Sequence, residues 1–138
     1  MDLNRAIGVL TARLLLGFIF FMQGFGKVFN MGVDNVYNSF FKETYQDLLP
    51  SFLTIATAYY TSFIELIGGM LLIFGFKKNM ALYFLASVLV IVTFGHGLAT
   101  PIWDLSHVMY RAMLLIFLLV IPASWDKYSL DTLLNQKK

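Results

Sequence analysis

The sequence predicts an all-α fold: an integral membrane four-helix bundle with an additional amphipathic helix in its first outer loop. Two observations carry this prediction. The chain is 59% hydrophobic and only 13% charged, where roughly 25% charged residues is usual in soluble domains. A domain of 138 residues could not bury so much apolar surface in water. The apolar residues also gather into four long segments, and residues 1–138 are interpreted as one domain.

The four predicted spans cover about residues 7–28, 52–75, 79–98 and 104–123. Each reaches the roughly 20 mostly apolar residues that a membrane-crossing helix needs. Arg5 before the first apolar run is a typical start of a signal peptide, but no A-x-A-like cleavage site follows the run. We therefore expect a retained first span.

The loop between the first two spans is predicted to form an interfacial helix over about residues 34–49. Apolar side chains recur there at three- and four-residue spacing, and charged or amide side chains fill the other positions. Such a helix lies in the membrane interface and would partly cover the bundle. The alternative is a plain connecting loop with some aromatic residues. The apolar positions are Val33, Val36, Tyr37, Phe40, Phe41 and Leu48.

Lysine and arginine residues outside the spans are unevenly distributed, which predicts the orientation. Both termini are expected to be cytoplasmic, with residues 30–51 and the turn near Pro101 facing outward. Trp103 and Trp125 then fall at opposite interfaces. The basic residues on the cytoplasmic side are Arg5, Lys77, Lys78, Lys127, Lys137 and Lys138, against Lys42 and the marginal Lys27 outside.

The net charge of +2 is too small to indicate nucleic acid as a partner. The lipid bilayer is the expected surrounding, and a membrane protein partner or a second copy of the chain is the expected neighbour. The absence of cysteine excludes disulfides, thiol relays and iron–sulfur clusters. No Rossmann fingerprint or P-loop is present, so the sequence leaves open whether the protein is an enzyme.

Charged and small residues share one face in each of the first two spans. At about 100° per residue, Arg13 and Lys27 lie on the same line of the first span, and Glu65 occupies the corresponding face of the second. Small residues let helices approach closely. The predicted packing glycines are Gly17, Gly24, Gly68 and Gly69.

Arg13, Glu65 and Arg111 are predicted to form a buried ion-pair network, because an unpaired charge near the bilayer centre is costly. A rise of about 1.5 Å per residue places Arg13 roughly 9 Å and Glu65 roughly 15 Å from the cytoplasmic end. We expect Glu65 to pair with Arg13, Arg111 or both. Whether this network only fixes helix register or also acts in function stays open at this point.

Gln23, Lys27, His96 and His107 are predicted to gather at the outer mouth of the bundle. They could anchor the protein at the interface, or line a pocket for a small lipophilic ligand with a polar head, such as a quinone. Metal binding with Asp104 is a weaker alternative, and no metal is predicted because the spacing matches no recognised site. A haem held by two histidines has no further support.

Three stretches resemble signatures of the DoxX family of small membrane proteins. They are "RLLLGFIFFMQGFGKV", "FIELIGGMLLIFGFKKNMALYFL" and the tail "WDKYSLDTLL", and the resemblance covers nearly the whole chain. It implies a four-helix bundle in the bacterial cytoplasmic membrane. The residues that match the family's motifs are Arg13, Gly24, Lys27, Glu65, Gly68, Gly69 and Gly75.

The resemblance also implies an accessory or quinone-interacting subunit of a membrane oxidoreductase system as the leading function, with a quinone as the candidate cofactor. The family includes subunits of thiosulfate:quinone oxidoreductase, maturation factors, cargo receptors and receptor-assembly chaperones. A non-enzymatic chaperone or assembly factor is therefore the alternative. A small transporter that uses Glu65 as a proton site is less favoured, since the sequence shows no repeat of broken helices.

Overall fold

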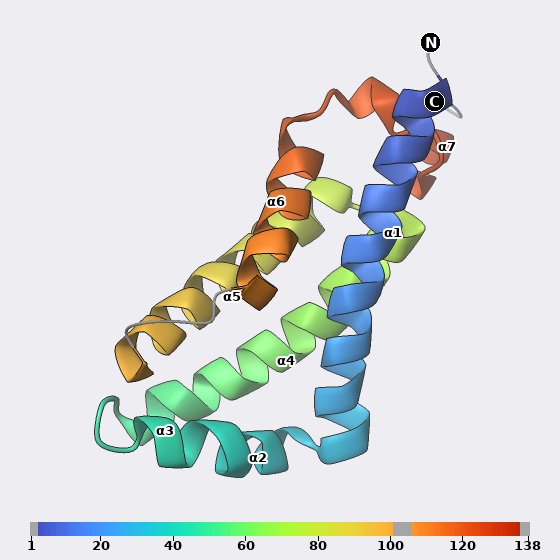
Figure 1. Ribbon diagram of the computed structural model, residues 1–138. Coiled ribbons are helices and arrows are strands. Elements are labelled where there is room, and N and C mark those ends of the chain that lie inside the picture. Colours follow the sequence, from blue (N-terminus) through green and yellow to red (C-terminus); the bar gives the residue numbers. More distant parts are fainter. Residues whose placement is uncertain (1–2, 101–105, 136–138) are drawn as a thin grey trace.

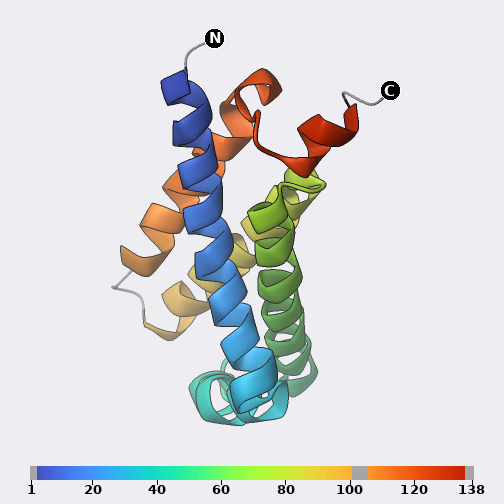
Figure 2. The same cartoon turned by 90° about the vertical axis from the view of Figure 1, so that its right-hand side faces the viewer.

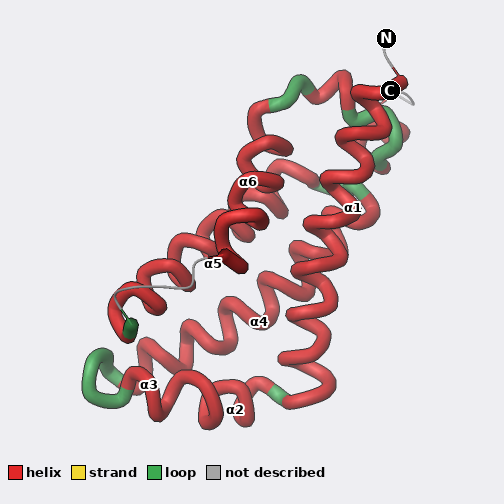
Figure 3. The backbone as a smooth tube through the Cα atoms, in the orientation of Figure 1, coloured by secondary structure: helices red, strands yellow, loops and turns green. Residues whose placement is uncertain are grey.

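A computed structural model describes residues 3–100 and 106–135, and all regular structure in these residues is helical (Figures 1 and 3). The long helices are α1 (Leu3–Phe25), α4 (Ser51–Phe74), α5 (Lys78–Ala99) and α6 (Ser106–Val120). The π-helix η1 (Gly26–Met31) continues α1. The short elements are α2 (Val33–Val36), η2 (Tyr37–Lys42), α3 (Glu43–Tyr45), η3 (Ala123–Trp125) and α7 (Leu130–Asn135).

Three helical segments are long and apolar enough to cross a membrane: Leu3–Met31, Ser51–Phe74 and Lys78–Ala99. Large apolar side chains remain exposed on their outer faces, as expected for helices solvated by lipid. Examples are Phe18, Met22, Phe63, Met70 and Phe84. The all-helical, membrane-spanning prediction is confirmed for these segments.

Within the fourth predicted span, 104–123, the structure describes helix α6 over Ser106–Val120, which is 15 residues. The helix ends before Pro122, which has no backbone N–H to continue it. The predicted start of this span, with Pro101, Trp103 and Asp104, lies outside the described residues.

Figure 2 shows the start of α1 and helix α7 at one end of the bundle and the α2–α3 segment at the other. Helices α1 and α4 lie against each other between Gly17 and Gly24 of α1, and they diverge toward α2 and α3 (Figure 1). Glycines make this crossing close. A Cβ atom at Gly24 would overlap the backbone of Leu66, and one at Gly69 would overlap the backbone of Phe21. Gly17 lies in the same contact, against Ile73, whereas Gly68 packs against Leu85 of α5.

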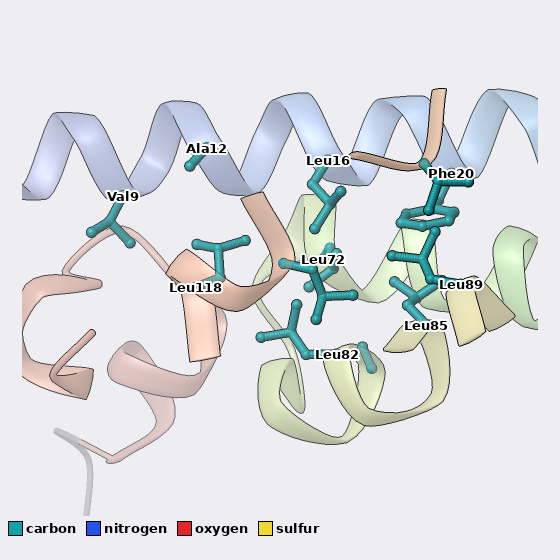
Figure 4. Close-up of a cluster of buried hydrophobic side chains, with 12 residues drawn as sticks. Val9, Ala12, Leu16, Phe20, Leu72, Leu82, Leu85, Leu89 and Leu118 are labelled. Carbon is teal, nitrogen blue, oxygen red and sulfur yellow. The ribbon is translucent and has the colours of Figure 1, made fainter. Parts of the chain in front are cut away.

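The hydrophobic core fills the half of the bundle nearer the chain ends. Its fully buried members come from all four long helices and interdigitate (Figure 4). They include Leu16 and Phe20 of α1, Leu72 of α4, Leu82 and Leu85 of α5, and Leu118 of α6. This core therefore does not fill the opposite half of the bundle, where α1 and α4 diverge.

A cluster of four charged residues and one serine closes the end of the bundle that carries both termini. We call it the terminal cluster: Arg13, Lys78, Asp126, Ser129 and Asp131. The Arg13 guanidinium donates to the carbonyl oxygens of Leu72 (2.8 Å), Ile73 (3.0 Å) and Tyr128 (2.5 Å). Asp126 pairs with Arg13 Nε at 3.4 Å and with Lys78 Nζ at 3.1 Å.

The predicted pairing of Arg13 with Glu65 is therefore wrong. The close contact of Gly24 with Leu66 fixes the register of the antiparallel helices, so that Arg13 lies opposite Leu72, about two helical turns beyond Glu65. Asp126, in the tail after α6, supplies the carboxylate instead. Counting residues along each helix gives the depth of a side chain, but not the place where two helices cross.

The turn between α4 and α5 fits this cluster closely. Gly75 ends α4 in a left-handed conformation (φ 65°), as is common at helix C-termini. A Cβ there would lie 2.5 Å from Arg13 Nη1 and 2.5 Å from Ser129 Cβ. The Asp131 carboxylate then accepts from the backbone N–H groups of Lys77 and Lys78, both at 2.9 Å.

Asp131 thus caps α5 from a distant part of the chain, and Asp131→Ala is expected to lower the free energy of unfolding by about 1 kcal/mol, the usual effect of losing a cap. Limited proteolysis in detergent should also cleave the C-terminal tail faster. The control is Asp47→Ala, at an exposed aspartate near the other end of the bundle. Equal cleavage of both variants would contradict the capping role.

A membrane cavity with one charged end

A cavity of about 700 Å³ occupies the half of the bundle in which α1 and α4 diverge. Helices α1, α4, α5 and α6 form its walls, and the short helices α2, η2 and α3 contribute from the side. Most of the lining is apolar. The apolar and aromatic lining residues include Val36, Phe40, Phe41, Leu49, Leu53, Val88, Leu89, Val92 and Phe94.

Four polar side chains meet at one place on the cavity wall, and we call them the polar cluster: Gln23, Lys27, Glu65 and Arg111. Lys27 Nζ donates to Glu65 Oε2 at 2.7 Å, and the Glu65 side chain is 1% exposed. Arg111 Nη1 donates to Gln23 Oε1 at 2.7 Å. Gln23 and Lys27 lie one helical turn apart and therefore bond to different helices: Lys27 to Glu65 on α4, and Gln23 to Arg111 on α6.

Arg111 is held in place by three contacts. Besides Gln23, its Nε donates to the backbone carbonyl of His107, one turn earlier, at 2.5 Å. Its guanidinium also lies 5.6 Å from the centre of the Phe20 ring, within the range of a cation–π contact. The predicted Glu65–Arg111 ion pair does not form: Glu65 pairs with Lys27, while Arg111 bonds neutral oxygens.

The two histidines lie together at the edge of this cavity. The His96 and His107 rings are 5.2 Å apart between centroids and meet edge to face at 77°. His96 is exposed and His107 half-buried. Within the described residues no group of three or more His, Asp or Glu side chains is placed to hold a metal ion, and Asp104 lies outside them.

Helix α4 presents three threonines to the cavity: Thr54, Thr57 and Thr61. Each hydroxyl donates to a carbonyl of its own helix, at 2.8–3.4 Å. Their hydroxyl donors are thus used within α4, and the hydroxyl oxygens remain able to accept hydrogen bonds. The structure uses this face of α4 as a cavity wall.

The segment from α2 to α3 packs over the cavity rather than extending away from it. The Tyr59 hydroxyl on α4 donates to Asp34 Oδ1 at 2.6 Å and so fastens α2 to the bundle. Tyr45 of α3 reaches α5, where a Cβ at Gly95 would lie 3.1 Å from its hydroxyl oxygen. Burial raises the pKa of the Tyr45 phenol, so this group stays a hydrogen-bond donor at neutral pH.

Tyr45 was not singled out from the sequence, although it lines the cavity. It follows Phe41 by four residues, and the two rings lie 6.0 Å apart. This spacing continues the apolar face of the predicted interfacial helix, so the signal was present in the sequence. What the sequence did not contain was the position of this helix against α5.

Fold, hydropathy and cavity together define a multi-pass membrane protein with an internal, largely apolar cavity. The chain belongs to the DoxX family, whose model matches residues 8–98. The match includes most of α1, the α2–α3 segment, α4 and nearly all of α5, and therefore most of the cavity wall. No curated protein and no solved structure shows a significant match to the chain.

Proposed function

We propose that this protein binds a lipophilic small molecule with a polar head, with a quinone as the leading candidate, and serves as an accessory subunit of a membrane oxidoreductase system. The observation that carries the proposal is the cavity of about 700 Å³ with apolar walls and one polar cluster. Small-molecule sites have this size and composition: mostly apolar linings with a few polar groups that orient the ligand.

The polar cluster matches the chemistry of a quinone head. Quinone carbonyl oxygens accept hydrogen bonds, and Lys27, Arg111 and Gln23 all carry N–H donors. The apolar walls on α4, α5 and η2 suit an alkyl or isoprenoid chain. Because the chain has no cysteine, electrons would be carried by the ligand and by a partner protein rather than by thiols of this chain.

The proposal includes a topology. Helix α6 would be the fourth membrane crossing, which completes a four-helix bundle. Both termini and the terminal cluster would face the cytoplasm of a bacterium, and the α2–α3 segment would lie in the outer interface. The basic residues Arg5, Lys77, Lys78 and Lys127 near the terminal cluster support this orientation.

The test is organic extraction of the protein purified in mild detergent, followed by mass spectrometry for quinones. We expect close to one quinone per chain in the natural protein and its loss in Gly95→Leu, because a side chain at Gly95 enters the cavity beside Tyr45. Gly97→Leu is the matched control: it is on the same helix, with no atom within 4 Å of the position that a Cβ would occupy. Quinone no higher than detergent background in the natural protein would overturn the proposal.

A further inference from the structure

Among the residues that the structure describes, the charges around the cavity do not balance. Three side chains that are charged at neutral pH line it among the described residues: Lys27, Glu65 and Arg111. Lys27 and Glu65 neutralise each other at 2.7 Å. Within residues 3–100 and 106–135 Arg111 has no carboxylate at ion-pairing distance. The polar cluster therefore carries a net charge of +1, counted as two cations and one anion.

Arg111 is also buried, and some of its hydrogen-bond donors have no acceptor among the described residues. Only 5% of the residue is exposed. A guanidinium has five N–H donors, and acceptors in the described part of the chain take two of them, one at Nε and one at Nη1. Three donors remain on a group that lines the cavity.

A buried cation with unused donors is costly unless an anion accompanies it. Buried charges in proteins are generally paired, and in a membrane interior an unpaired one is strongly disfavoured. The acceptors that these residues offer to Arg111, a peptide carbonyl and an amide oxygen, are neutral. These two hydrogen bonds orient the Arg111 guanidinium but do not neutralise its charge.

We infer that the molecule bound in this cavity has an anionic head, a carboxylate or an ionised ring hydroxyl, and that Arg111 is its counter-ion. The inference rests on the proposed ligand-binding function and narrows the ligand class to acidic lipophiles. The head would accept from the remaining guanidinium donors, beside Gln23. Its apolar body would lie along the α4 and α5 walls. The Lys27–Glu65 pair limits the site to a single negative charge.

Two sources of such a head exist in a membrane: an acidic quinone and a long-chain carboxylic acid. The experiment compares each acid with a neutral analogue of the same size. The probes are an alkyl hydroxynaphthoquinone and its methyl ether, and a fatty acid and the fatty alcohol of the same length. Dissociation constants are measured with the full chain in nanodiscs of phosphatidylcholine, at a pH where the acids are ionised.

At least one acid is expected to bind about tenfold or more tightly than its neutral analogue, the effect of a charge-assisted hydrogen bond in a buried site. Arg111→Gln should remove this preference, and Arg111→Lys should keep most of it. Glu65→Gln should strengthen it, because the local charge then rises from +1 to +2. Misfolding would not make one variant lose the preference for the acid and another gain it. Binding to Gly95→Leu gives the background of non-specific partitioning into the nanodisc.

Equal binding of both acids and their neutral analogues to the natural protein would overturn the inference and leave the proposed quinone site standing. An acid preference that persists in Arg111→Gln would overturn the assignment of Arg111 as counter-ion. Preference for the fatty acid alone would support the inference and remove the quinone from the proposed function. Binding of no probe above the Gly95→Leu background would overturn both.

Discussion

Gly69→Ala is expected to lower the free energy of unfolding by about 3 kcal/mol, at the upper end of what an added core methyl group costs. The added Cβ would overlap the backbone of Phe21 and lie against the carbonyl of Gly17. A backbone cannot rotate away as a side chain can, so α1 and α4 must separate along their contact. Denaturation by sodium dodecyl sulfate, followed by circular dichroism in mixed micelles, measures the change.

The matched control for this prediction is Gly8→Ala on α1. Gly8 is exposed, and no atom lies within 4 Å of the position that its Cβ would occupy. Alanine has a higher helix propensity than glycine, by about 1 kcal/mol in a helix interior. Gly8→Ala should therefore be neutral or stabilising. If both variants unfold at the same detergent fraction, the close crossing of α1 and α4 is not what makes Gly69 necessary.

The separation of α1 and α4 would also affect the cavity. Gly24 lies in the same contact, one turn before Lys27, and its neighbour across the interface is Leu66, next to Glu65. The crossing therefore sets the distance over which Lys27 reaches Glu65. A substitution that moves the helices apart is expected to weaken ligand binding as well as stability, although it touches no polar atom of the cavity.

Much of the helical framework could be predicted from the sequence, since it follows from local patterns. The lengths of the apolar runs predict α1, α4 and α5, and the three- and four-residue spacing of Val36, Phe40 and Phe41 predicts helix between α1 and α4. The end of the fourth helix was predicted less closely. Its apolar residues continue to Ile121, but the chain leaves the helix at Val120, ahead of Pro122.

The members of the polar cluster could be proposed from the sequence, whereas their pairing could not. Gln23, Lys27, Glu65 and Arg111 stand out as polar residues inside apolar runs. Which cation pairs with Glu65 depends on where two helices cross, and that depends on the combined fit of Gly17, Gly24 and Gly69 against the opposite backbone. Asp126 was missed for a related reason: the tail after α6 has no apolar period, and its contacts with Arg13 are entirely non-local.

Arg13→Met is expected to destabilise the protein by about 3–5 kcal/mol, the usual effect of removing one partner of a buried ion pair. Asp126 is 4% exposed and would keep only Lys78 as a partner among the described residues, while the carbonyls of Leu72 and Tyr128 would lose the hydrogen bonds from Arg13. Methionine fills a similar volume but offers no donor. The detergent fraction at half-unfolding measures the loss.

Two further variants separate the shape of Arg13 from its charge. Arg13→Lys keeps the charge but replaces a planar fork that reaches three carbonyls and a carboxylate, so it should restore only a minor part of the stability. Arg5→Met is the control for losing a cation from α1, because Arg5 is exposed and its guanidinium lies over the Trp125 ring at 4.8 Å. It should cost less than about 1 kcal/mol. If Arg13→Lys is as stable as the natural protein, charge alone holds the tail to α4. If Arg13→Met is as stable as Arg5→Met, the terminal cluster does not hold the bundle closed.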